Sequence, residues 1–172
     1  REAPVSVQPA SAHLRELRAA RLVETEKQGK YVIYRIANRE VAGFWVAIRS
    51  LAEDRLVELR NVIEQMVSHP TELAPQDRES LVKMARKGDV VVLDVRPSDE
   101  FLAAHLPFAR SIPIDELKLR LAELPKGKKV VAYCRGPYCL IARDAVELLR
   151  KKGYDAVRLP EGVAEWGIAP VR

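Results

Sequence analysis

The chain of 172 residues contains two cysteines, Cys134 and Cys139, and the surroundings of the first favour thiolate chemistry. Cys134 follows the apolar run 129–133 and precedes Arg135 and a short loop with glycine and proline. A loop of this kind can direct several backbone N–H groups at one atom and so hold an anion. The positive end of the helix that follows and the charge of Arg135 act in the same direction. We therefore expect Cys134 to have a lowered pKa and to be a nucleophile at neutral pH.

Other roles for the two cysteines lead to different expectations. Cys134 could instead be a small buried residue at a strand end, as free cysteines often are. Cys139 is either a packing residue at the start of a helix or a second thiol that receives sulfur or forms a disulfide. Two cysteines cannot fill a four-ligand zinc site unless other residues help, and a disulfide between them would close a very short loop. We therefore expect neither a structural metal site nor a stabilising cross-link.

The second half of the chain alternates short strand and helix patterns, which is typical of a parallel α/β sheet with helices on both faces. The apolar run 90–95 predicts a strand that is buried on both sides. Ligands of such sheets collect at the carboxyl ends of the strands, where Cys134 stands. The predicted elements are helices at 77–87, 100–105, 115–124 and 140–152, strands at 90–95, 111–113, 129–133 and 156–159, and a turn at 163–166.

Five short motifs in this half carry a family resemblance. They are Asp94-Val-Arg96-Pro97, Glu100 with His105, Ala109-Arg-Ser-Ile-Pro113, Val131-Ala-Tyr-Cys134-Arg135 and Glu161-Gly-Val-Ala-Glu-Trp166. In this order they resemble the signatures of a rhodanese domain over residues 77–172. The resemblance implies that Cys134, with Arg135 beside it, accepts sulfane sulfur as a persulfide and passes it to a thiol, with neither metal nor cofactor. It assigns the active-site loop to Gly136, Pro137, Tyr138, Cys139 and Leu140, and the supporting positions to Asp94, Arg96, Glu100 and His105. Among the supporting residues, Asp94 and Arg96 are implied to be ions that fix the loop. His105 is implied to be a packing or hydrogen-bonding residue.

Two loop positions differ from the usual rhodanese pattern. Pro137 stands where many rhodaneses have glycine, and it removes one N–H group from the loop. Cys139 stands where many have arginine, which weakens recognition of an anionic donor such as thiosulfate, although Arg135 can compensate. The related phosphatases and arsenate reductases clamp an oxyanion with an arginine where this chain has Leu140. The loop therefore fits a persulfide carrier or sensor of low turnover better than an efficient thiosulfate sulfurtransferase.

The first half of the chain is more basic and has another pattern. Residues 1–39 hold eight basic and four acidic residues, +4 of the formal net charge of +5, and a basic segment is where nucleic acid would bind. Ser6 can cap a helix that follows it, and a β-hairpin with strands at 22–26 and 31–36 comes next. From Asn38 to Met66 a broad apolar stripe predicts one long helix, whose face needs a partner helix from a second subunit.

This order of helix, hairpin and long helix resembles the recognition helix, wing and dimerisation helix of ArsR-type winged-helix repressors over residues 4–67. The resemblance implies a homodimer on double-stranded DNA, with small polar side chains in the major groove and lysines on the phosphate backbone. The candidate DNA-contacting residues are Ser6, Gln8, Ser11, His13, Arg15, Lys27 and Lys30. His13 is equally compatible with half-buried packing beside Leu14. A winged helix usually has further helices before the recognition helix, so we expect this domain to be N-terminally incomplete.

The sequence thus predicts a partial winged helix-turn-helix domain at 1–69, a proline-containing linker at 70–76 and an α/β rhodanese-like domain at 77–172. The predicted function is a DNA-binding repressor that senses reactive sulfur through a persulfide on Cys134. The alternatives are a sulfurtransferase whose N-terminal part only dimerises, and a regulator whose rhodanese domain binds a ligand without catalysis. No apolar run reaches the ~20 residues that span a bilayer, and the reduced thiols predict the cytoplasm.

Overall fold

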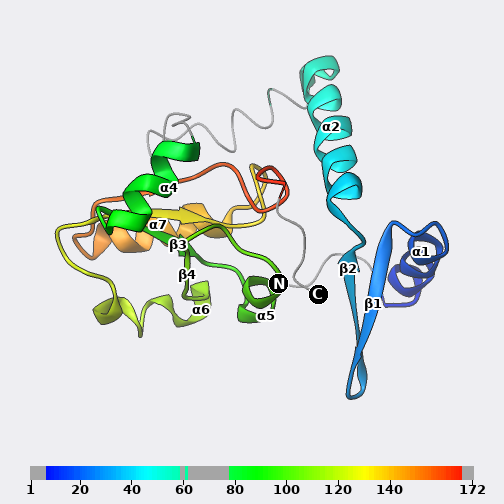
Figure 1. Ribbon diagram of the computed structural model, residues 1–172, viewed down its shortest axis with the longest axis horizontal. Coiled ribbons are helices and arrows are strands. Elements are labelled where there is room, and N and C mark those ends of the chain that lie inside the picture. The colour runs from blue at the N-terminus through cyan, green and yellow to red at the C-terminus, as the bar shows by residue number, and fades with distance from the viewer. Residues whose placement is uncertain (1–6, 59–60, 62–77, 168–172) are drawn as a thin grey trace.

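The computed structural model describes residues 7–58, 61 and 78–167. Figure 1 shows the first helix, the hairpin and the helix that follows at one end of the molecule, and a sheet covered by helices at the other. The predicted linker at 70–76 lies outside the described residues. No helix among the described residues is long and apolar enough to cross a membrane.

The N-terminal end consists of one helix and one hairpin. Helix α1 spans Val7–Ala19, and the antiparallel strands β1, Val23–Gln28, and β2, Tyr31–Ile36, follow it. Gly29 has a φ of +60°, a left-handed conformation that glycine adopts without strain, and this closes the hairpin tightly. The predicted helix and hairpin are therefore present, with β1 beginning one residue later and ending two residues later than expected.

Helix α2 differs from the expectation of one helix from Asn38 to Met66. It spans Arg39–Arg55, begins with Asn38 as its N-cap and ends at Leu56, whose backbone is extended. The apolar side chains Leu56 and Val57 are both more than half exposed, so no packing holds the next turn in line with α2. The apolar period from Asn38 to Met66 predicted that these side chains share one face. Side chains can share a face even where the helix is interrupted, so the period did not reveal the break at Leu56.

The second half of the chain forms a parallel sheet in the order β4-β3-β5-β6. The strands are β3, Val90–Asp94, β4, Arg110–Ser111, β5, Lys129–Tyr133, and β6, Ala156–Arg158. The central strand β3 is buried at every position, as its continuous apolar run predicted. The predicted α/β parallel sheet is confirmed.

Helices cover both faces of this sheet. One face packs against α7, Ile141–Lys151, and the short α6, Ile114–Leu117, and the other packs against α4, Arg78–Lys87, and the segment after α5, Ser98–Ala103. Alternate residues of β3 face the two layers, as strand geometry requires.

The predicted helix at 115–124 is two short turns rather than one helix. Helix α6 ends at Leu117, and a 3₁₀ turn, η1, spans Leu121–Glu123. Leu117 and Leu124 are both buried against the sheet. Two short turns satisfy this apolar spacing as well as a continuous helix does, so the period alone did not separate the two structures.

Candidate active site

The two cysteines lie in one loop at the carboxyl end of the sheet. Cys134 follows the last residue of β5 directly, and helix α7 begins at Ile141. The loop closes on itself through the N–H group of Cys139, which donates to the carbonyl oxygen of Gly136 at 3.1 Å. Gly136 has a φ of +134°, which a residue with a side chain rarely adopts. The sequence thus placed the loop correctly between strand and helix.

The loop holds the two sulfur atoms together. Cys134 is 2% exposed, Cys139 is half-buried, and the Cys134 Sγ donates to the Cys139 carbonyl oxygen at 3.3 Å. The two side chains are also hydrogen-bonded to each other, and the N–H groups of Gly136 and Ala142 donate to the Cys134 sulfur. Those of Arg135 and Ile141 donate to Cys139. The amides therefore surround a pair of sulfurs.

The proton of this pair stays on the buried member. The hydrogen bond from Cys134 lowers the pKa of Cys139, and the two backbone N–H groups and the charge of Arg135 add to this effect. The same hydrogen bond and burial raise the pKa of Cys134. The expected lowered pKa of Cys134 is therefore wrong, because the more exposed Cys139 competes for the same positive surroundings. At neutral pH the pair holds one proton and one negative charge.

A shared proton has a measurable consequence for alkylation. We expect iodoacetamide to modify Cys139 with a pH midpoint below the ~8.5 of an ordinary thiol. In Cys134→Ala the donor is lost, so the pKa of Cys139 rises and its midpoint moves up by about one pH unit. Peptide mapping by mass spectrometry over a pH series measures both. Equal midpoints in the two proteins would show that the thiols do not share a proton.

Arg135 and Glu100 form an ion pair beside the loop. The Arg135 Nε lies 3.0 Å from Glu100 Oε2, and its Nη2 also contacts this carboxylate. The pair connects the loop to α5 and raises the pKa of Arg135 through the hydrogen bond to Glu100. His105 is exposed, stacks on the Phe101 ring at 4.1 Å between centroids and has its Nδ1 3.0 Å from the Phe101 carbonyl oxygen. This is the geometry of a packing and hydrogen-bonding residue.

Asp94 and Arg96 form a buried ion pair under the site. Asp94 is 0% and Arg96 6% exposed, and Arg96 Nη2 lies 2.6 Å from Asp94 Oδ2. The same Nη2 donates to the Ala104 carbonyl oxygen at 2.7 Å, which ties the end of β3 to the segment after α5. Burial alone would lower the pKa of Arg96, but the hydrogen bond to Asp94 raises it. The geometry is that of a brace below the cysteine loop.

The closing turn of the chain, residues 161–166, packs on the backbone of the cysteine loop. A Cβ atom added to Gly162 would lie 2.7 Å from the Cys134 carbonyl oxygen and 2.8 Å from the Gly136 nitrogen. Glu165 accepts from the N–H of Gly162 at 2.6 Å. From β6, Arg158 Nη1 donates to the Pro137 carbonyl oxygen at 3.4 Å. The closing motif contains Gly162 and Glu165, but residue spacing gives no signal for their contacts or for that of Arg158.

The geometry agrees with a comparison of the sequence with known families. A model described as "Rhodanese-like domain" matches residues 77–169. The chain belongs to the rhodanese-like family. The cysteine loop of this rhodanese-like domain is the strand-to-helix loop just described.

Two relatives of this rhodanese-like protein are named for different functions. The chain is 38% identical over 160 residues to the HTH-type transcriptional regulator Rv0324 of Mycobacterium tuberculosis, and the match covers 93% of this chain and 70% of that protein. It is 33% identical over 92 residues to a sulfurtransferase of Allochromatium vinosum, covering 52% of this chain and 84% of that one. A full-length protein from Lactobacillus plantarum has a similar fold, with a TM-score of 0.50, 20% identity and coverage of 69% and 99% of the two chains.

A cleft of about 810 Å³ opens beside the cysteine loop of the rhodanese-like domain. Arg135 and Ile141 border it on the loop side. Four carboxylates also line it, from Asp99, Asp115, Glu116 and Asp144. This negative charge disfavours a doubly charged donor such as thiosulfate. No cluster of metal-ligating side chains occurs among the residues that the structure describes.

Helix α2 contacts the cysteine loop from outside the sheet. Arg49 Nη1 lies 2.6 Å from Glu165 Oε1, with side chains only 14% and 8% exposed. The Arg49 guanidinium also lies over the Tyr138 ring at 5.6 Å, and the Tyr138 hydroxyl contacts the Glu53 carboxylate. The spacing of Arg49 and Glu53 on one helix face is a signal for a charged pair. It does not reveal that their partners lie about a hundred residues away.

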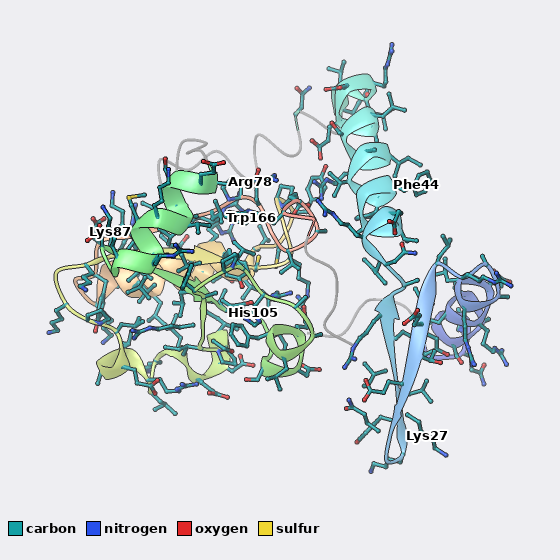
Figure 2. All side chains as sticks on the ribbon, in the orientation of Figure 1. Lys27, Phe44, Arg78, Lys87, His105 and Trp166 are labelled. Carbon is teal, nitrogen blue, oxygen red and sulfur yellow. The ribbon has the colours of Figure 1, made fainter. Side chains whose placement is uncertain are left out.

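The candidate DNA-contacting residues lie at the far end of the molecule from the cysteine loop. They are exposed on α1 and at the hairpin tip, namely Gln8, Ser11, His13, Arg15, Lys27 and Lys30. Figure 2 shows Lys27 at this tip. The His13 side chain is 71% exposed and its Nδ1 lies 3.8 Å from Glu16, so its half-buried alternative is wrong. Ser6 lies outside the described residues.

Proposed function

We propose that this protein is a DNA-binding transcriptional regulator whose rhodanese-like domain accepts sulfane sulfur on Cys134. The main support is that a helix of the N-terminal half, α2, contacts the loop that carries both thiols. The relative named as a transcriptional regulator aligns over 93% of this chain, and so over both halves. The relative named as a sulfurtransferase aligns over about half of it.

The sulfur-accepting step uses the proton shared by the two thiols. The Cys134 sulfur attacks the sulfane sulfur of a persulfide donor, and the S–S bond of the donor breaks. The donor leaves as a thiolate, and the proton of Cys134 passes to the neighbouring Cys139 thiolate. Cys134 then carries the persulfide, which accepts hydrogen bonds from the backbone N–H groups of Gly136 and Ala142.

DNA recognition is assigned to α1 and the hairpin. The exposed polar residues of α1 have the size and chemistry to reach base edges in a major groove. Lys27 and Lys30 at the hairpin tip suit phosphate contacts. Together they form a partial winged helix-turn-helix module with α2 behind it.

The contact between α2 and the cysteine loop is the proposed route of communication. Added sulfur must be accommodated in a loop whose Tyr138 contacts Glu53 and whose Gly136 packs against Glu165, the partner of Arg49. Any shift of the loop therefore changes the contacts of α2. Coupling of DNA affinity to persulfidation requires two states that differ in such contacts.

The test measures sulfur uptake and DNA affinity on the same full chain. A DNA sequence is first selected from a random pool at moderate salt, and its affinity is measured before and after treatment with polysulfide. We expect a change of about tenfold in the wild type, none in Cys134→Ser, and a lost response with retained uptake in Arg49→Ala. Mass spectrometry counts the added sulfur.

Each contrary outcome removes a defined part of the proposal. Failure to enrich any DNA sequence would leave a sulfurtransferase whose N-terminal part only dimerises, the alternative that the sulfurtransferase relative favours. Equal affinities before and after uptake would remove sensing. Absence of both a sulfur adduct and a Cys134–Cys139 disulfide would leave a domain that binds a ligand without catalysis.

The exposed apolar face of α2 predicts a homodimer. Phe44, Ile48 and Leu51 are 61%, 45% and 55% exposed, at the spacing of one helix face. Figure 2 shows Phe44 on the side of α2 away from the rhodanese-like domain. A second copy covers such a face by twofold symmetry, because the same patch meets itself.

Charges on this face should separate the subunits. We expect Phe44→Glu with Ile48→Glu to give a monomer, since each buried apolar side chain contributes roughly 1.5–3 kcal/mol. Light scattering over a concentration series measures the mass. The matched control is Leu119→Glu, at a side chain that is 86% exposed on the rhodanese-like domain, and it should remain dimeric. A wild type that is monomeric at every concentration would contradict the dimer.

A further inference from the structure

The Cys139 thiol lies beside Cys134, where a group that reacts with a Cys134 persulfide is needed. The Cys139 and Cys134 side chains are hydrogen-bonded, and the Cys134 Sγ lies 3.3 Å from the Cys139 carbonyl oxygen. Cys139 is free, half-buried and packed against the core under α7. Two thiols of one short loop whose side chains interact can react without a large movement of the chain.

Cys139 has an advantage of position over an acceptor thiol from solution. Cys134 is 2% exposed, and the backbone of Gly162 packs against the loop at van der Waals distance. A thiol from solution would have to approach this nearly buried sulfur, as the donor did before it. Cys139 is already beside it, and a reactant held in place gains a large effective concentration over one in solution.

We propose that Cys139 is a resolving thiol, which converts the Cys134 persulfide into a Cys134–Cys139 disulfide and releases the sulfur as sulfide. This inference rests on the proposed uptake of sulfur by Cys134. The domain would then be a persulfide reductase, in which the two thiols of Cys134 and Cys139 supply the two electrons that reduce the sulfane sulfur. The disulfide then persists after the sulfide has left, and it is the lasting signal that reaches α2.

The reaction balances without any further oxidant. The Cys139 sulfur attacks the inner sulfur of the Cys134 persulfide, so the bond between the two cysteine sulfurs forms and the bond to the outer sulfur breaks. The outer sulfur leaves with its hydrogen and takes the proton of Cys139, which gives hydrogen sulfide. The sulfane sulfur is reduced to sulfide, and the two thiols are oxidised to the disulfide. A dithiol reductant from solution restores the thiols for the next cycle.

The surroundings of Cys139 suit this role. The N–H groups of Arg135 and Ile141 and the charge of Arg135 favour the anion of Cys139, so they assist the loss of its proton as it attacks. Arg135 itself is held by Glu100 at 3.0 Å. An arginine at position 139 would bind an anionic donor but could not perform this step.

The experiment follows one turnover of the full chain without an added reductant. The reduced protein receives less than one equivalent of a small alkyl persulfide, freshly released from its protected precursor. We expect the wild type to release one sulfide for each persulfide consumed and to lose the mass of two hydrogens per modified chain. Cys139→Ser should instead gain the mass of one sulfur and release no sulfide above the level of Cys134→Ser. Peptide mapping should join residues 134 and 139 in the wild type.

The outcomes separate this inference from the function on which it rests. A wild type that keeps the extra sulfur and forms no disulfide overturns the resolving role and leaves uptake intact. Sulfur found on Cys139 as its own persulfide also overturns it, since attack then occurred at the outer sulfur. No change in any protein means that Cys134 does not accept sulfur at all. The wild-type mass and sulfide measurements stand even where the variant melts at a lower temperature.

Discussion

Gly162→Ala is expected to abolish most of the sulfur uptake, although it adds only one methyl group. The added Cβ would meet the Arg135 carbonyl carbon at 2.7 Å, the Cys134 carbonyl oxygen at 2.7 Å and the Gly136 nitrogen at 2.8 Å. These are backbone atoms, which cannot rotate away as a side chain can. Either the closing turn or the cysteine loop must move. Overpacking of this kind costs about 1–3 kcal/mol of stability.

The loss of activity should exceed the loss of stability. A displacement of the loop misplaces the Cys134 sulfur and its N–H donors together, and a shift of that kind can slow a reaction roughly a hundredfold. The rate at which the protein consumes persulfide, followed by mass spectrometry of the protein, measures the first effect, and thermal unfolding measures the second. The control is Gly43→Ala, where nothing lies within 4 Å of the added Cβ, and its uptake rate should be unchanged. Uptake at the wild-type rate in Gly162→Ala would contradict the close packing.

The second large effect is expected at Asp94, on stability. Its carboxylate is fully buried and accepts from Arg96 through Nε at 3.0 Å and Nη2 at 2.6 Å, and through the Arg96 N–H at 3.0 Å. Asp94→Ala leaves the Arg96 charge buried, with only the partly exposed Glu100 carboxylate 3.8 Å from its Nη1 as an opposite charge. Breaking a buried pair in this way costs about 3–5 kcal/mol. That is a large part of the roughly 5–15 kcal/mol by which native domains are stable.

Chemical denaturation of the full chain measures this effect. We expect a large fall in the unfolding midpoint for Asp94→Ala and a smaller one for Asp94→Asn, which keeps the shape and part of the hydrogen bonding. The control is Glu116→Gln, which breaks an ion pair with Arg120 of similar length, 2.8 Å, on the exposed surface. Its midpoint should hardly change, because solvent screens such pairs. Equal midpoints for the variants at Asp94 and Glu116 would refute the brace.

Much of the fold follows from local patterns in the sequence. The apolar run of β3, the strand β5 at 129–133 and the strand β2 at 31–36 are all found where their patterns predicted. Each depends on alternation or continuous burial within a few residues. The errors, at the end of α2 and after Leu117, occur where one apolar period suits a continuous helix and a broken one equally.

The part of the candidate site that depends on local chain order was predicted from the sequence, and the part that depends on burial was not. The loop between β5 and α7 brings Cys134 and Cys139 to the sheet edge by local chain order. The division of the proton between them depends on burial and on which backbone N–H groups donate hydrogen bonds to each sulfur. Neither quantity can be read from residue spacing, so the lowered pKa was expected on the wrong cysteine.

What the sequence alone determined is the order of strands and helices and the placing of two thiols in one strand-to-helix loop. The tertiary structure alone decided which distant groups surround that loop: Gly162 against its backbone, and Arg49 of α2 bonded to Glu165. Periodicity and turn chemistry act over a few residues, so they leave a signal in neighbouring positions. Contacts between segments about a hundred residues apart depend on how whole layers pack, and nothing in the neighbouring positions of either segment records them.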